Sequence, residues 1–244
     1  MSVRPFGLTT RLTPPKRALL AGDERKKVGF EVTALLGMHI ITGLALPTTY
    51  RTGDIYRQMT TSGSIEVETL LLAARVGLTA YFVAASGLPL RRFGLVRPRV
   101  VRDTIVFVMA CAVCGAIWWV GPLIHRGHDA IEGVEGKPVP SLFLLCVAYW
   151  VVGFGEELLY RGYLITRLKQ LFSSDFQVLI LSSLIFGSVH AYQGLPGMAM
   201  TALFGLAFGF LFMRTRTLWP LAVAHAGEDL IGALIVFARS GMRF

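Results

Sequence analysis

The feature that most constrains this chain is a series of long apolar runs separated by short polar segments. A helix that crosses a lipid bilayer needs about 20 mostly apolar residues, and about seven runs approach or meet that length. They lie at residues 28–47, 67–90, 103–124, 140–160, 176–193, 195–213 and 218–238. This pattern predicts an all-α fold, a polytopic integral membrane bundle of about seven transmembrane helices.

The composition also favours the membrane. The 244 residues are 54% hydrophobic and 16% charged, whereas a soluble domain carries about 25% charged residues. The net charge of +9 does not indicate nucleic acid, because the basic residues lie between the apolar runs. Cys111, Cys114 and Cys146 fall within the runs, so we expect small buried hydrophobic side chains. The C-x-x-C spacing of the first two lacks the second cysteine pair or histidine of a redox or metal site.

The basic residues of the connecting segments predict the orientation. When the segments are assigned to alternate sides of the membrane, 17 of the 24 lysines and arginines share the side of the N-terminus, and 6 lie opposite. This excess places the N-terminus in the cytoplasm. The small size and short loops favour a multi-pass protein of a bacterial cell membrane. A half-inserted segment or an eighth span at 48–66 remains an alternative.

The chain divides into three expected parts. Residues 1–27 form a basic cytoplasmic tail, residues 28–139 form the N-terminal transmembrane spans, and residues 140–238 carry three groups of polar residues within apolar runs. Ionisable side chains within a membrane are costly, so their default interpretation is a functional site. The third part is therefore where we expect the chemistry.

The first group holds two adjacent carboxylates, Glu156 and Glu157. Adjacent residues of a helix point about 100° apart, so the two cannot face one small cavity equally. Arg161 follows Glu157 by four residues, which places them on one helix face as an ion pair. Glu156 is then the freer carboxylate. The simplest alternative is a helix end whose charges reach the cytoplasmic interface.

The other two groups place a histidine four residues from a partner. Phe186 and His190 share one face of a helix, and so do His225 and Asp229. A carboxylate beside an imidazole can orient the ring and raise its basicity. A single histidine in a span is more often a packing residue, but the acid pair and the two histidine groups together indicate buried acid–base chemistry.

These groups resemble the signature motifs of a known family. Glu156-Glu157-x-x-x-Arg161, Phe186-x-x-x-His190 and His225-x-x-x-Asp229 are similar in order, spacing and residue type to the three motifs of the CPBP intramembrane proteases. That family includes the type II CAAX prenyl endopeptidases and bacterial proteins linked to bacteriocin self-immunity. The resemblance covers residues 140–238, and no motif can be matched in residues 1–139.

The resemblance implies an endopeptidase that hydrolyses peptide bonds in a cavity of a helical bundle. Glu156 would match the glutamate that activates a water, and His190 the histidine that works with it. His225 and residue 229 would match the pair that stabilises the oxyanion. Glu157, Arg161 and Phe186 would support them. The expected partners are a protein or peptide substrate, CAAX-type or another bacterial peptide or membrane protein, and the lipid bilayer.

Two points of the implied mechanism stay open. The family often has Asn where this chain has Asp229, and an ionised aspartate cannot donate to an oxyanion. Asp229 is therefore either protonated or only orients His225. The metal is the second point, because Glu156, His190 and His225 offer a zinc-type ligand set. No His-Glu-x-x-His motif is present, so we favour a glutamate-activated water without a cofactor.

Two other functional classes compete with a peptidase. A proton-coupled transporter would also place glutamates and histidines in the membrane, but it is expected to show repeats or broken helices in two halves. No clear repeat is present. A non-catalytic immunity or scaffold membrane protein with the same fold would carry the same residues, so the sequence does not separate it from an enzyme.

Overall fold

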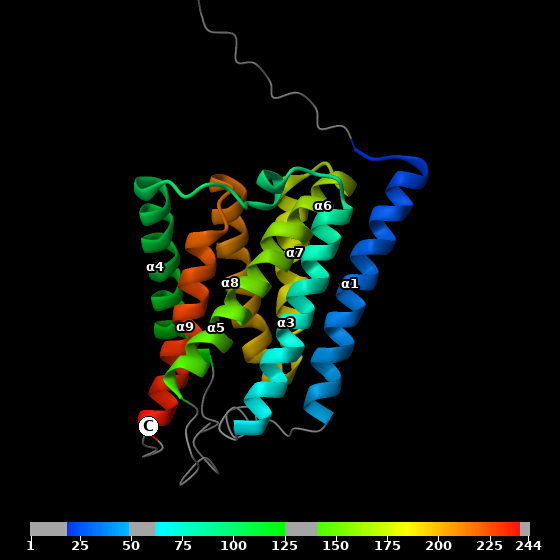
Figure 1. Ribbon diagram of the computed structural model, residues 1–244. Helices are drawn as coiled ribbons and strands as arrows, with labels where there is room; N and C mark the ends of the chain where they lie inside the picture. Colours follow the sequence, from blue (N-terminus) through cyan, green and yellow to red (C-terminus); the bar gives the residue numbers. More distant parts are fainter. Residues whose placement is uncertain (1–18, 49–61, 125–140, 240–244) are drawn as a thin grey trace, which may run out of the picture.

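A computed structural model describes residues 19–48, 62–124 and 141–239, and every regular element in these ranges is helical (Figure 1). The long helices stand side by side, with α1 and α3 at one edge and α4 with α9 at the other. They are α1 (Gly22–Thr48), α3 (Ser62–Ala85), α4 (Val100–Ile124), α5 (Leu142–Glu156), α7 (Asp175–Ser188), α8 (Gly194–Thr215) and α9 (Trp219–Arg239). Shorter elements are η1 (Leu90–Phe93), η2 (Glu157–Leu164), α6 (Ile165–Leu171) and η3 (Ala191–Gln193).

Each of the seven apolar runs is helical over most of its length, which confirms the all-α expectation. Within the described residues, three helices are long and apolar enough to cross a membrane: Val100–Val120, Leu142–Leu171 and Gly194–Thr215. Ala73–Ala85 and Asp175–Ser188 are apolar but shorter. The polytopic bundle therefore agrees with the structure, whereas the number of crossings stays a prediction. The alternative segment at 48–66 falls mostly outside the described residues.

The largest departure from expectation concerns the fourth run, which was predicted to end at residue 160. The helix instead continues from α5 through a π-helical turn, η2, and then α6, as far as Leu171. Arg161, Arg167 and Lys169 therefore lie in a buried helix rather than in a loop. Each of these cations has an acidic partner that offsets the cost of burial. These partners are Glu157 for Arg161, Glu31 for Arg167 and Asp175 for Lys169.

The polar connections at one end of the bundle are joined to one another. Segments 86–99 and 216–218 and the start of α1 lie at the same end, uppermost in Figure 1. The Leu218 N–H donates to the Gly94 carbonyl at 3.0 Å, and the Trp219 indole N–H donates to the Val96 carbonyl at 3.1 Å. A groove of about 480 Å³ there is lined by Arg91, Arg92, Arg97, Arg99, Arg102 and Arg216. These arginines, which the loop charges predict to lie on one side of the membrane, therefore share one end of the helical bundle.

Small residues bring the carboxy-terminal helices close together. A Cβ on Gly187 would meet the Met198 carbonyl oxygen at 2.7 Å, and one on Gly209 would meet Leu179 at 2.8 Å. Gly205 and Gly209 therefore allow α7 and α8 to pack closely. Ser174 caps α7, accepting from the Gln177 N–H.

The cysteine expectation was only partly right. Cys114 is buried, whereas Cys111 and Cys146 are exposed on the outside of the bundle, and all three are free thiols. An apolar run does not distinguish the face packed against other helices from the face turned outward, which in a membrane meets lipid.

Candidate active site

Glu157 is the central group of the candidate site. It is fully buried at the junction of α5 and η2. Its Oε1 lies 2.8 Å from Nη1 of Arg161 and accepts a hydrogen bond of 2.8 Å from Nδ1 of His225. The predicted pair with Arg161 is therefore present. The bond to His225 was not predicted, and it joins the first sequence motif to the third.

Arg161 is enclosed by aromatic rings. Its guanidinium carbon lies 4.3 Å from the ring centre of Phe186 and 5.5 Å from those of Phe204 and Phe208. Arg161 is 1% exposed, and a buried guanidinium is stabilised by an anion and by the faces of aromatic rings. Phe186, the first residue of the second motif, thus contacts the charged pair of the first motif.

A close approach of α5 and α9 brings His225 to the glutamates. A Cβ on Gly153 would lie 2.6 Å from the backbone nitrogen of Ala226, so a larger residue would separate the two helices. Because a carboxylate only accepts, the His225 bond to Glu157 places a proton on Nδ1. Nε2 of His225 then faces two other acids, at 3.8 Å from Glu156 Oε2 and 3.8 Å from Asp229 Oδ2.

The carboxylates differ in access. The side chain of Glu157 is 0% exposed, whereas those of Glu156 and Asp229 are 24% and 27% exposed. His225, between the two exposed acids, is 7% exposed at its side chain. Glu156 and Asp229 are therefore the accessible acids of the cluster, whereas Glu157 is enclosed.

His190 lies beside this cluster at the end of α7. Its Nδ1 is 2.8 Å from the Phe186 carbonyl oxygen, which requires the proton on Nδ1 and leaves Nε2 as the acceptor nitrogen. The Phe186 ring centre lies 4.9 Å from the ring of His190 and 6.4 Å from that of His225. The ring of Phe186 therefore lies beside both histidines and links the second motif to the third.

The alternative zinc ligands do not form a cluster here. Among the described residues, no group of three or more His, Cys, Asp or Glu side chains is placed to hold one metal ion. The Nδ1 atoms of His190 and His225 are both engaged by protein oxygens, which leaves Nε2 of each ring as its possible ligand atom. Metal dependence is therefore a question for experiment.

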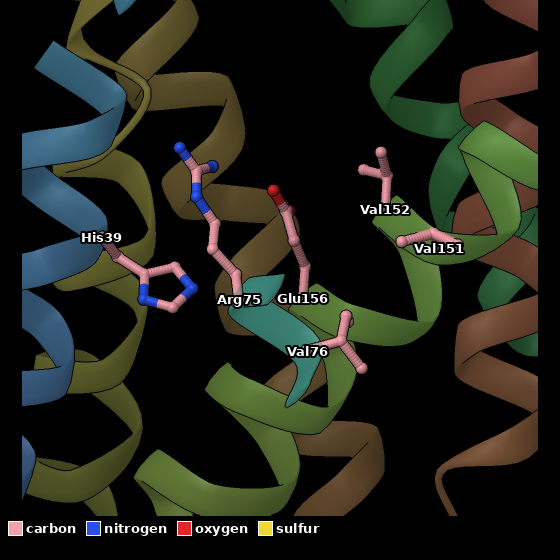
Figure 2. A pocket seen from close by; sticks show the side chains of 7 residues that line it. His39, Arg75, Val76, Val151, Val152 and Glu156 are labelled. Carbon is pink, nitrogen blue, oxygen red and sulfur yellow. The ribbon is translucent and has the colours of Figure 1, made fainter. Parts of the chain in front are cut away.

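Two residues outside the three motifs also lie near Glu156. Figure 2 shows His39 of α1 and Arg75 of α3 beside Glu156, where a small cavity is lined by His39, Arg75, Val76, Val151, Val152, Gly155 and Glu156. The signal that could have singled out Arg75 is its charge inside an apolar run.

The comparisons with known proteins concern the same segment. Residues 138–231 match the family model described as type II CAAX prenyl endopeptidase Rce1-like. No curated protein and no solved structure matches the chain significantly. The matched residues include all three motifs and the helices from α5 to most of α9. The resemblance to the CPBP proteases is thereby confirmed over this segment, which is similar to a family of membrane peptidases.

Proposed function

We propose that the protein is an intramembrane endopeptidase in which Glu156 activates the attacking water. The observation that carries the proposal is the convergence of two accessible acids, Glu156 and Asp229, on the imidazole of His225, within the segment similar to the peptidase family. Glu156 is the fifteenth residue of the continuous helix Leu142–Leu171. The cluster therefore lies midway along the bundle, at a depth expected for cleavage within a bilayer.

The proposed reaction uses Glu156 as the base and the two ring nitrogens of His225 as donors. Glu156 takes a proton from a water, and the hydroxide attacks the carbonyl carbon of the scissile peptide, whose C=O π electrons move onto oxygen. His225, when protonated on both nitrogens, donates from Nε2 to this oxyanion. The C–N bond then breaks, and the proton held by Glu156 passes to the leaving amine. The net change is one peptide bond and one water converted to an acid and an amine.

The other residues of the cluster have positioning or supporting roles in this proposal. Glu157 accepts from Nδ1 of His225 and so fixes the plane of the ring. Arg161 compensates the charge of Glu157. His190, through its Nε2, is assigned the support of the water beside Glu156, as the resemblance implies. Asp229 faces Nε2 of His225 and orients it.

The test compares cleavage of membrane proteins in cells that carry the wild type or Glu156→Gln. The variant keeps the size of the side chain and removes the base, so membrane-protein fragments should disappear while the amount of folded protein stays unchanged. Glu24→Gln is the matched control, because Glu24 is exposed in the first turn of α1. Identical fragment patterns in wild-type and Glu156→Gln cells would argue against a peptidase and favour a non-catalytic role.

A further inference from the structure

The cavity beside Glu156 has a charged wall that the proposed reaction does not use. Arg75 of α3 and Glu156 at the end of α5 extend side by side across it, and His39 of α1 lies on the far side of Arg75 (Figure 2). Val76, Val151, Val152 and Gly155 complete the lining. The cavity therefore combines one cation, one acid and apolar walls.

Arg75 has unmet hydrogen-bonding capacity. Its Nε and Nη2 are buried and, within the described part of the chain, have no hydrogen-bond partner. Glu156 lines the same cavity but does not bond these two nitrogens. A guanidinium stays protonated in proteins and carries only donors, and a buried donor without an acceptor is costly. An acceptor that enters the cavity, best an anion, would satisfy these two nitrogens.

The size of the cavity limits the anion. Its volume of about 20 Å³ suits about one or two water-sized groups, since one water needs about 10–15 Å³ by the same measure. The two oxygens of a carboxylate fit that space, whereas a whole side chain does not. The planar fork of an arginine also matches a carboxylate in two parallel bonds.

We propose that Arg75 binds a carboxylate of the peptide substrate close to the scissile bond, an inference that rests on the peptidase proposal. The carboxylate lies near the reacting peptide because Glu156, the proposed base, lines the same cavity. Two sources supply this group, the free carboxy terminus of the substrate or an Asp or Glu side chain beside the cleavage site. Arg75 is then a specificity-determining residue, contributed by a helix outside the matched segment 138–231.

The experiment uses four synthetic peptides that span a cleavage site found by the Glu156→Gln comparison. They have either a free carboxylate or an amide at the carboxy terminus, and either an acidic residue or its amide beside the cleaved bond. Full-length protein in lipid nanodiscs is assayed as wild type, Arg75→Gln, Arg75→Lys and Arg91→Gln. Arg91 is the matched control, since it is exposed in η1.

We expect neutralising one of the two carboxylates to lower the wild-type kcat/KM by about 10- to 100-fold, as for loss of a charge-assisted bond. Which peptide is affected identifies the source. Arg75→Gln should lower kcat/KM for the charged peptide by a similar factor and remove the discrimination. Arg75→Lys should retain part of it, and Arg91→Gln all of it.

The outcomes distinguish failure of the Arg75 carboxylate site from failure of the peptidase activity on which it depends. If the Glu156→Gln comparison finds no cleavage site, and the wild type cleaves no peptide, the peptidase proposal itself fails. If the wild type cleaves all four equally, or Arg75→Gln lowers all four by one common factor, the carboxylate site is overturned while the peptidase stands. The wild-type comparison needs no variant, so the inference is tested even where Arg75→Gln does not fold.

Discussion

At the scale of single residues, two adjacent glutamates have opposite environments. Glu157 is buried in the bundle between Arg161 and His225, whereas the Glu156 side chain is partly exposed and lines a small cavity. The reason is the turn of the helix, which points neighbouring side chains about 100° apart. Burial therefore favours a positioning role for Glu157, and the proposed reaction assigns the base to Glu156.

Removing the partner of Glu157 should cost stability. Arg161→Ala leaves Glu157 as a buried carboxylate beside three emptied aromatic contacts, and we expect a loss of about 3–5 kcal/mol of unfolding free energy. Thermal unfolding in detergent measures it, with Arg214→Ala as the control because Arg214 is exposed near the end of α8. Equal melting temperatures for the two variants would mean that the pair adds no stability.

One set of measurements tests both the role of Asp229 and whether activity requires a metal ion. Asp229→Asn keeps the shape and adds an N–H donor, so if Asp229 only orients His225 or supplies a proton to the oxyanion, cleavage should continue. Activity should also survive exhaustive chelation in metal-free buffer. Loss of activity on chelation, its return with zinc, and a zinc affinity weakened about 10–100-fold in Asp229→Asn would instead indicate a metal enzyme.

At the scale of elements, the site depends on how closely α5 and α9 approach. The contact between Gly153 and the backbone of Ala226 lies one turn from Glu157 and next to His225. The π-helical turn that follows is fully buried, and such turns inside α-helices are frequent at functional sites. The turn places Arg161 against Glu157 and carries the helix on to α6, where Arg167 pairs with Glu31 of α1.

A methyl group at Gly153 should therefore separate the two helices. In Gly153→Ala the new Cβ would lie 2.6 Å from the Ala226 nitrogen and 2.9 Å from its Cα. Because these are backbone atoms, they can move away only if the helix moves. We expect about 1–3 kcal/mol of destabilisation and a large loss of cleavage, because His225 moves away from Glu157. Gly115→Ala is the control, since nothing lies within 4 Å of its Cβ position. A Gly153→Ala protein with wild-type cleavage would show that the approach is not needed.

At the scale of the whole molecule, the candidate site includes helices outside residues 138–231, the segment similar to the peptidase family. Motif residues come from α5, η2, α7 and α9, while α1 and α3 close the cavity beside Glu156. The arginine-lined groove and the joined connections lie at one end of the bundle. This arrangement agrees with a single cytoplasmic face, on which the orientation prediction depends.

Cysteine labelling tests that orientation. In a background without Cys111, Cys114 and Cys146, a membrane-impermeant reagent applied outside intact cells should label Asp129→Cys and spare Leu95→Cys, because residue 95 lies between Arg92 and Arg97 in the basic end. Both positions should react after the membrane is permeabilised. Labelling of residue 95 alone in intact cells would reverse the orientation.

The sequence by itself determined the helices, the three motifs and the Glu157–Arg161 pair, because these depend on hydropathy and on spacing along one helix. Only the tertiary structure decided that His225 bonds Glu157, that Glu156 and Asp229 are the accessible acids, and that Arg75 shares the cavity with Glu156. It also decided that the fourth helix continues past Arg161. The physical reason is that contacts between helices depend on local approaches such as Gly153 with Ala226 and on the π-helical turn. The spacing of residues within a single helix does not predict these contacts between helices.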